Sequence, residues 1–566
     1  MQSSFFRRGH NGAVPLTSAL VAGSSRGGSA LIVVLVLIVM LSLAAYSFSE
    51  RMITENESSE YALKQAQARA CAESGIEYAA LMLDAEEDPE QPLALYHDPA
   101  MFAGVSLTGS SSQVAGRFTF VAPYENDSTG TRVRAGLIDE SAKLNLNAIS
   151  SFELDEDQEQ LLMMNIPGMT EEIADAILDW IDEDDDQRIS GAENDDYESL
   201  SPPYTARNAA IESLDELLLV QGMTPLLLYG EDANRNGLLD PNENDADATL
   251  PLDNGDGLLD PGLAAYFTVD SLESNLQPDG SDKIDVNQDL LADMYDQIAE
   301  ALGEDEALFI TAFALYGATN VDPLDDSSSD ELSTGNQQTD EGLQNAAAGM
   351  ARAISGGEGV VTRAGLDLTQ GRTWTFDSLF DLVDAEVEAE INQETKTLKS
   401  PWSSGGDPES FKTLFDTLST TTSATIEGRV NINEARREVL LGIPGMLESV
   451  ADSIVSSQLI GEDGTPMTDT LLRRSTPGWL LLDGLVDVTT MRQLDKYVTA
   501  GGDVFRLQVL GHLDGPGPIV RIEATIDRTE SPPRVVSRRD LAPLGPGYRP
   551  EWLVPAGNGG NATGIP

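Results

Sequence analysis

The sequence has 566 residues and a formal net charge of −61 at neutral pH, and these two properties already limit what the protein can be. A chain of this length can form more than one domain with a hydrophobic core. The negative charge would be repelled by nucleic-acid phosphates and by anionic membrane surfaces, which argues against nucleic-acid partners. The single cysteine, Cys71, allows no intramolecular disulfide, and three histidines are too few for a histidine-rich zinc or haem site.

Residues 1–28 are rich in serine and glycine with scattered arginine, as in a disordered leader peptide. An apolar run follows from Gly28 to Tyr46, and no charged residue occurs between Arg26 and Glu50. About twenty helical residues cross a hydrocarbon core of about 30 Å. Because arginines precede the run and an acidic chain follows it, the positive-inside rule predicts a cytoplasmic leader and an extracytoplasmic body.

Three interpretations of this apolar run compete. It can be a cleaved secretory signal, for which Leu43-Ala44-Ala45 would supply the small residues of a cleavage site. It can also be a plain signal anchor. The third interpretation is a prepilin-type signal, which is cut before the run so that the hydrophobic helix remains on the mature protein. The length of the run disfavours the first, but hydropathy does not separate the other two.

The helix is expected to continue beyond the membrane over residues 29–87, and Asp88-Pro89 ends it. Small and apolar residues recur near helical spacing in its second half. They are Ala62, Ala66, Ala70, Ile76, Ala80 and Leu83. A helix of roughly fifty residues with this pattern needs a sheet or other helices to cover its apolar face.

Alternating patterns predict strands near both ends of the chain. A hairpin is expected from 117–121 and 131–138, and further strands at 504–510, 519–526 and 534–538. The simplest topology joins residues 88–143 and 476–543 into one antiparallel sheet packed on the long helix. Residues 144–475 would then be a helical insertion, and the Pro/Gly/Asn-rich tail, residues 544–566, would be disordered.

An internal repeat marks the insertion. The segments 144–147, 284–287 and 430–433 each alternate apolar residues and end at an asparagine that can cap the following helix. Two copies continue into Ile-Pro-Gly-Met, at 166–169 and 443–446, a helix-hairpin-helix signature. Such turns can grip a DNA phosphate, but acidic residues surround both of them. A compact scaffold for protein contacts is therefore the favoured interpretation.

The strongest chemical motif is the segment 232–243, which satisfies the calcium-loop pattern at its demanding positions. Gly237 supplies the sharp turn, and the alternative is an acidic loop that arises by chance. A helix over 213–228 is expected to lead into it, and a lone loop is favoured over a paired EF-hand because Pro251 and Gly255 follow. The predicted calcium ligands are Asp232, Asn234, Asn236, the Leu238 carbonyl, Asp240 and Glu243.

A second acidic segment keeps the ligand spacing less well, because Gln187 replaces the turn glycine. Metal binding and a solvated acidic run are both open there. The predicted ligands are Asp182, Asp184, Asp186 and Glu193. Asn254, Asp256, Gly257 and Asp260 fit only the middle of the pattern and indicate a turn. No spacing of His10, His97 and His512 suggests a base and nucleophile pair, so no catalytic site is predicted.

Several motifs together resemble the minor pseudopilin K family of the type II secretion system (general secretion pathway protein K). They are Arg26–Val34, Gly136–Asn147, Leu178–Asp182, Pro203–Asn208 and Leu214–Met223. The resemblance implies cleavage by prepilin peptidase after Gly28 and N-methylation of Ser29. It implies an α+β fold: a pilin-like long N-terminal helix on a small antiparallel sheet, interrupted by a large α-helical domain with helix-hairpin-helix (SAM-like) repeats.

The resemblance also implies a non-enzymatic function. The protein would be a tip subunit of the periplasmic pseudopilus, in complex with the I and J minor pseudopilins, held in the inner membrane by one span. The resemblance implies calcium binding in the inserted α-domain, which agrees with the predicted loop at 232–243. The usual glutamate at the fifth mature position is Val33 here, which suits a subunit with no neighbour above it. The alternative is a calcium-binding adhesin or signalling ectodomain on a plain anchor, and a calcium-dependent hydrolase is a third possibility.

Overall fold

The computed structural model describes residues 27–85, 94–107, 115–127, 129–246, 248–321, 361–458, 468–515 and 517–549. Residues 1–26 of the predicted leader, an acidic segment of the sequence at 322–340 and the predicted tail beyond residue 549 lie outside these ranges. The chain divides into two compact units, Met1–Lys64 and Gln65–Pro566.

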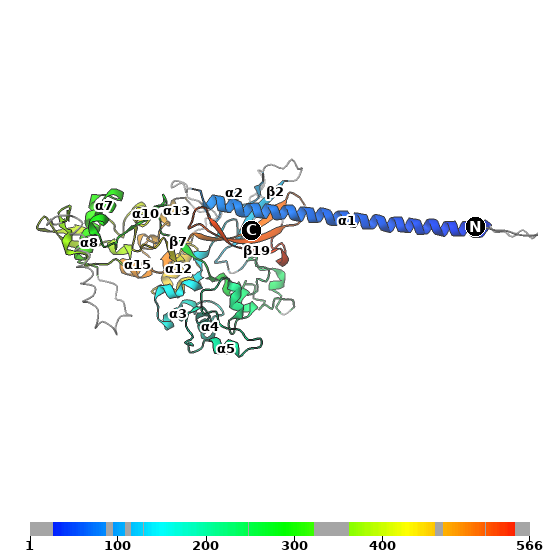
Figure 1. The fold of residues 1–566 in the computed structure, drawn as a ribbon, viewed down its shortest axis with the longest axis horizontal. Helices are drawn as coiled ribbons and strands as arrows, with labels where there is room; N and C mark the ends of the chain where they lie inside the picture. The colour runs from blue at the N-terminus through cyan, green and yellow to red at the C-terminus, as the bar shows by residue number, and fades with distance from the viewer. Residues whose placement is uncertain are drawn as a thin grey trace, which may run out of the picture. The chain divides into compact units, whose positions relative to one another are not determined.

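The first unit contains most of the helix α1, which runs from Gly27 to Leu83 and has 57 residues. Every residue from 30 to 64 is exposed. This helix is long and apolar enough to cross a membrane, by length and composition. The predicted long N-terminal helix is therefore present, and Figure 1 shows it as one continuous element.

In the second unit, the last turns of α1 pack on a sheet. The buried positions of the helix include Ala68, Ala72, Ile76 and Ala79, which contact sheet residues such as Val509. The predicted stripe was partly wrong, because Ala62, Ala66 and Ala70 are exposed. Alanines occur on both sides of this helix, so the sequence pattern alone does not select the face that the sheet covers.

The sheet joins both ends of the chain, as predicted. Its strands run in the order β1-β2-β17-β18-β19, all neighbours are antiparallel, β3 pairs with β2, and β4 pairs with β17. The bounds are β1 Val105–Ser106, β2 Gly116–Pro123, β3 Val133–Arg134, β4 Ile138–Asp139, β17 Val504–Leu513, β18 Val520–Asp527 and β19 Arg534–Asp540.

The predicted second strand of the hairpin, 131–138, is divided between β3 and β4. The reason is Arg134, which is fully buried at the break. Its guanidinium donates to the carbonyls of Pro123 (3.0 Å) and Leu137 (2.6 Å) and pairs with Glu125 (2.6 Å). The chain curls around this side chain, because a buried guanidinium needs acceptors on several sides.

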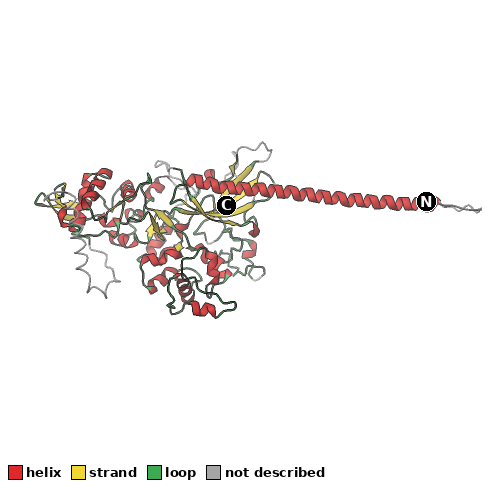
Figure 2. Ribbon diagram, in the orientation of Figure 1, coloured by secondary structure: helices red, strands yellow, loops and turns green. Residues whose placement is uncertain are grey.

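The insertion between β4 and β17 contains helices and short two-stranded sheets, so it is mixed rather than purely helical (Figure 2). It also extends past 475, since α14 and α15 belong to it. With the short α2 (Pro99–Phe102) that precedes β1, the helices are α3 Glu156–Met163, α4 Glu171–Ile181, α5 Asn194–Glu198, α6 Pro225–Tyr229, α7 Leu291–Ala301, α8 Glu304–Tyr316, α10 Pro408–Thr417, α11 Arg437–Gly442, α12 Glu448–Ser457, α13 Thr468–Arg473, α14 Trp479–Leu482 and α15 Val488–Leu494.

The three repeat segments have the same role in the structure. Each forms a short strand that pairs in parallel with a strand much later in the chain. The pairs are β5 Leu144–Asn145 with β6 Phe267–Thr268, β8 Ile284–Asp285 with β13 Leu418–Ser419, and β15 Val430–Asn431 with β16 Val498–Thr499. Further strands in antiparallel pairs are β7 Leu272–Ser274 with β14 Thr425–Glu427, β9 Thr362–Arg363 with β10 Leu366–Asp367, and β11 Glu386–Ile391 with β12 Glu394–Lys399.

The last asparagine of each repeat bridges distant backbone instead of capping the next helix. The Asn147 amide nitrogen donates to the carbonyls of Ile211 (3.0 Å) and Val269 (2.9 Å). Asn287 and Asn433 donate to two distant carbonyls in the same way. In the first copy, the cap is the earlier Asn145, whose side chain accepts from the backbone of Asn147.

The helix pairs α3–α4 and α11–α12 are joined by the two Ile-Pro-Gly-Met turns. Gly168 and Gly445 have φ of 80° and 81°, where a side chain would be strained. Asn165 donates its amide to the carbonyl of Leu441 at 3.0 Å, so the first turn touches the end of α11. The first and third repeats thus share one core.

Candidate functional site

The predicted calcium loop is a compact turn stabilised by its own carboxylates. The two Asp232 oxygens accept hydrogen bonds from the backbone nitrogens of Asn236 (2.9 Å) and Gly237 (2.8 Å). Gly237 has φ of 69°, as the turn position of the pattern requires. The 3-10 helix η4 (Pro241–Glu243) closes the loop. The predicted lead-in helix over 213–228 is broken into η3 (Leu214–Leu219) and α6.

The far end of the loop folds back on its start. The Glu243 carboxylate, which is 1% exposed, accepts from the backbone nitrogens of Ala233 (3.1 Å) and Asp240 (3.0 Å). Asp240 accepts from the amides of Asn234 (2.6 Å) and Asn236 (3.0 Å). The loop therefore gathers the predicted side-chain ligands within one hydrogen-bonded network.

The electrostatics of this loop favour a cation. Burial, together with the charges of Asp232 and Asp240, raises the pKa of Glu243 to about 7. Burial also raises the pKa of Asp232. The buried Asn234 Oδ1 has no hydrogen-bond partner among the described residues. The loop places hard oxygen donors around a glycine turn, and burial disfavours ionisation of its carboxylates unless a cation neutralises them. Both properties fit calcium.

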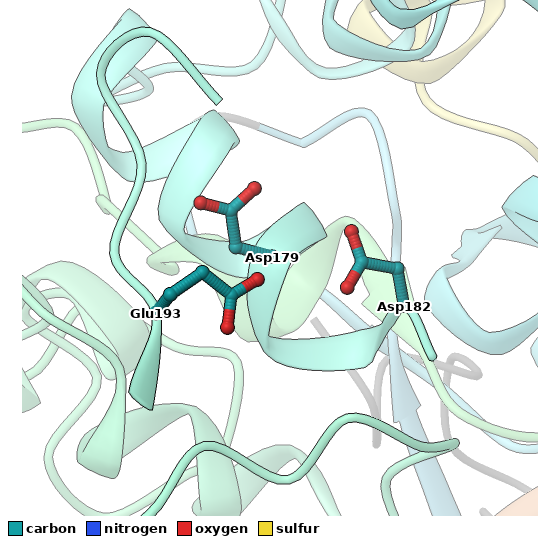
Figure 3. Close-up of side chains that lie close together, drawn as sticks. All are labelled: Asp179, Asp182 and Glu193. Atoms are coloured by element: carbon teal, nitrogen blue, oxygen red, sulfur yellow. The ribbon is translucent and has the colours of Figure 1, made fainter. Parts of the chain in front are cut away.

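The second acidic segment brings together a different set of residues from the predicted one. Carboxylate oxygens of Asp179, Asp182 and Glu193 lie within 4.8 Å of one another. Figure 3 shows the three side chains gathered at the carboxyl end of α4, with Glu193 on the returning chain. Asp184 and Asp186 are not members of this group, and the Asp184 carboxylate accepts from the Asp186 backbone nitrogen at 2.8 Å.

Asp179 was missed because it lies within a helical sequence pattern, in which a single aspartate is normally interpreted as a solvent-exposed residue. The available signal was its spacing of three residues from Asp182, which places both carboxylates on one face at the helix end. Gln187 stands at the position of the expected glycine and donates to the Gly191 carbonyl at 2.7 Å. This hydrogen bond connects the loop to the segment just before Glu193.

One arginine, shared with a carboxylate outside the group, is the cation recorded beside these three carboxylates. Burial raises the pKa of Asp179 to about 6 and those of Asp182 and Glu193 to about 7. Both Glu193 oxygens are buried without a hydrogen-bond partner among the described residues. Arg188 lies 3.4 Å from Asp179 but also pairs with Glu159 at 2.6 Å. Two buried carboxylates and a half-buried one, with oxygens of Asp182 and Glu193 that accept no hydrogen bond from the described residues, fit a divalent cation.

Residues 142–229, which include this group, match a family model described as the first domain of the type II secretion system (T2SS) protein K. These residues are therefore similar to the first domain of protein K of the type II secretion system. The family resemblance expected from the sequence motifs is thereby confirmed.

Two known proteins can be compared with the chain. It is 27% identical over 213 residues to the type II secretion system protein K of Klebsiella pneumoniae, which covers 35% of this chain and 59% of that relative. A solved structure of a GspK–GspI–GspJ complex from enterotoxigenic Escherichia coli is similar with a TM-score of 0.33 and 13% identity. That match covers 87% of this chain and 99% of the other.

The two candidate cation sites lie differently with respect to the protein K domain. The group of Asp179, Asp182 and Glu193 is inside the matched residues, whereas the 232–243 loop begins just after them. The predicted processing residues Gly28 and Ser29 lie in the first turn of α1.

The segment Asn254–Asp260 forms successive turns, as expected from its partial match to the calcium pattern. Asn254 and Asp256 accept from the backbone nitrogens of Asp256 and Leu258, at 2.8 Å each.

Proposed function

We propose that the protein is a minor pseudopilin of the type II secretion system, which initiates or caps the periplasmic pseudopilus at its tip. The observation that carries the proposal is a protein K domain inserted behind a long apolar N-terminal helix. The protein acts by assembly and is not an enzyme. It is held in the inner membrane by one span, and its body lies in the periplasm.

The partners follow from the same proposal. Prepilin peptidase removes the leader, and the I and J minor pseudopilins bind the mature protein. A carboxylate at the fifth mature position would pair with the terminal amine of a neighbouring subunit. Val33 offers none, and an unpaired carboxylate in lipid would be costly. A subunit without that carboxylate suits the end of the filament.

The helix pairs α3–α4 and α11–α12 are inferred to be helix-hairpin-helix units that serve as a scaffold for protein contacts. Their turns have the glycine conformation that the signature needs. The first turn of α4 carries Glu171 and Glu172, both exposed. These charges would repel a DNA phosphate from the helix N-terminus, so a nucleic-acid role is disfavoured.

Each candidate cation site is proposed to hold one calcium ion with a structural role. Asp232, Asn234, Asn236, Leu238, Asp240 and Glu243 would supply the first site, and Asp179, Asp182 and Glu193 the second. Bound calcium supplies positive charge, which lets the buried carboxylates ionise without mutual repulsion. The predicted Asp184 and Asp186 would at most contribute from outside the group.

Leader processing tests the central proposal. We expect the mature protein from cells to begin at N-methylated Ser29, as measured by mass spectrometry of the N-terminal peptide. Replacement Gly28→Leu should leave the leader attached, whereas Gly23→Leu within the leader should not affect cleavage. A mature chain that keeps its leader would contradict the proposal and favour a membrane-anchored ectodomain.

Calcium binding is tested by titration calorimetry on the full-length protein in detergent. Asp232→Asn should remove one binding event and Glu193→Gln the other. Calcium at about a hundredfold excess over the dissociation constant should stabilise the fold by about 2.7 kcal/mol per site. Asp256→Asn is the matched control, because Asp256 lies in a neighbouring turn and is not a proposed ligand. Absence of calcium binding to the wild-type chain would refute the metal role alone.

A further inference from the structure

The outer side of the 232–243 loop is held by residues from the sheet and from the end of the chain. Three consecutive loop carbonyls each accept a hydrogen bond from outside the loop. Arg521 on β18 donates to Asn234, Gln508 on β17 donates to Arg235 at 3.0 Å, and the Tyr548 hydroxyl donates to Asn236 at 2.8 Å. The loop is therefore fixed across the sheet by its backbone.

The carboxy-terminal segment Gly545–Arg549, called the C-terminal strap below, completes this arrangement. Sequence composition predicted disorder from residue 544, but Tyr548 is only 5% exposed. Its ring packs in a small apolar cluster with Leu238 of the loop and with sheet residues such as Val121 and Leu510. One tyrosine thus joins the loop, the sheet and the end of the chain.

The strap also controls the orientation of a proposed ligand. The amide nitrogen of Asn236, a residue that is 1% exposed, donates to the Gly547 carbonyl at 2.7 Å. The same nitrogen donates to Asp240 at 3.0 Å, so both of its hydrogens are used. The amide oxygen is thereby fixed on the opposite side of the amide group, where it accepts from the Leu238 nitrogen within the loop at 2.7 Å.

We propose that the C-terminal strap is a positioning element of the calcium loop, so that docking of the strap and binding of calcium are coupled. The inference rests on the proposed calcium role of the loop. When the strap is docked, Gly547 holds the Asn236 amide and Tyr548 holds the Asn236 carbonyl. When calcium orders the loop, both partners are presented to the strap. Linkage requires each event to strengthen the other by the same factor.

The first experiment measures calcium affinity in the full-length Glu193→Gln protein, in which only the loop titrates. Tyr548→Phe keeps the ring and removes the hydroxyl, and we expect it to weaken calcium binding about fivefold, the effect of one hydrogen bond. Tyr548→Ala should weaken it more. Tyr497→Phe is the matched control, because that tyrosine packs on Phe152 in a different apolar cluster from the one that contains Tyr548.

The second experiment needs no substitution in the strap. Hydrogen exchange of the peptide that covers 541–549 should slow when calcium is added to the wild-type protein and should not respond in the Asp232→Asn variant. The coupling would be overturned, and the calcium role left intact, by two results together. Tyr548→Phe would bind calcium with wild-type affinity, and the hydrogen exchange rate of the 541–549 peptide would be the same with and without calcium. A wild-type loop that binds no calcium would overturn both.

Discussion

Two neighbouring buried side chains, Arg134 and His97, differ in their charge state. Arg134 is fully buried and is compensated by Glu125 and by backbone carbonyls. His97 lies beside it and accepts a hydrogen bond from the Ala135 nitrogen through Nδ1, at 3.1 Å. Burial, reinforced by the positive charge of Arg134, lowers the pKa of His97 to about 4. This histidine is therefore neutral in the folded protein.

The neutral state of His97 predicts a pH dependence of stability. As the pH falls from about 6.5 to about 4, the unfolded chain binds a proton at this histidine and the folded chain does not. The contribution is complete above about pH 6.5 and is lost as the pH falls through 4. The wild-type protein is expected to lose stability on the order of 3 kcal/mol over this range. The variant His97→Asn, which keeps an acceptor for the Ala135 nitrogen, should not show this loss.

The measurement is the free energy of unfolding from urea titrations at several pH values, with chelator and salt held constant. The relevant quantity is the difference between wild type and variant, since many carboxylates titrate in both. Parallel pH profiles for the two proteins would contradict this assignment.

At the scale of elements, the insertion is organised by its three bridging asparagines. Each joins a short parallel strand to backbone that lies far away in the sequence. In the first repeat the bridge is complete in both directions, because the Ile211 nitrogen also donates to the Asn147 side-chain oxygen at 2.9 Å. The middle repeat lacks the Pro-Gly turn but keeps its bridge, so the bridge defines the repeat better than the turn does.

Asn147→Asp is expected to destabilise the fold by about 2–4 kcal/mol, because a carboxylate would face two carbonyl oxygens instead of donating to them. Asn287→Asp should have an effect of the same direction in the middle repeat. Thermal and urea unfolding measure the change, and Asn56→Asp on the exposed part of α1 is the control. A loss no larger than that of the control would show that the bridges are dispensable.

For the whole molecule, the dominant physical property is a net charge of −61. Mutual repulsion of so many carboxylates opposes the compact state, and dissolved salt screens it. We expect the midpoint of thermal unfolding to rise by several degrees, about 5 °C, between about 0.01 M and about 1 M monovalent salt.

Choline chloride should act like sodium chloride, which separates screening from specific ion binding. In the Asp232→Asn, Glu193→Gln double variant the effect should persist, because it arises from the whole surface. A midpoint that falls or stays constant with salt would argue that surface repulsion does not limit stability.

Local sequence patterns determined much of this protein. The apolar run and its continuation predicted α1, alternation predicted β2, β17, β18 and β19, and the repeats predicted three equivalent segments. The 232–243 loop was found because its proposed ligands are neighbours in the sequence. In each of these cases the information lies within a few turns of helix or one strand, where spacing alone fixes which side chains share a face.

Only the tertiary structure decided the rest. It selected the buried face of α1, divided the strand at Arg134, added Asp179 to the second acidic group and placed Tyr548 against the loop. The division of the strand at Arg134 and the second acidic group depend on how neighbouring segments fold back on one another. The buried face of α1 and the position of Tyr548 depend on contacts between residues hundreds of positions apart, such as Asn236 with Gly547. Spacing along the chain carries no information on such contacts, because they form only when the sheet brings both ends of the chain together.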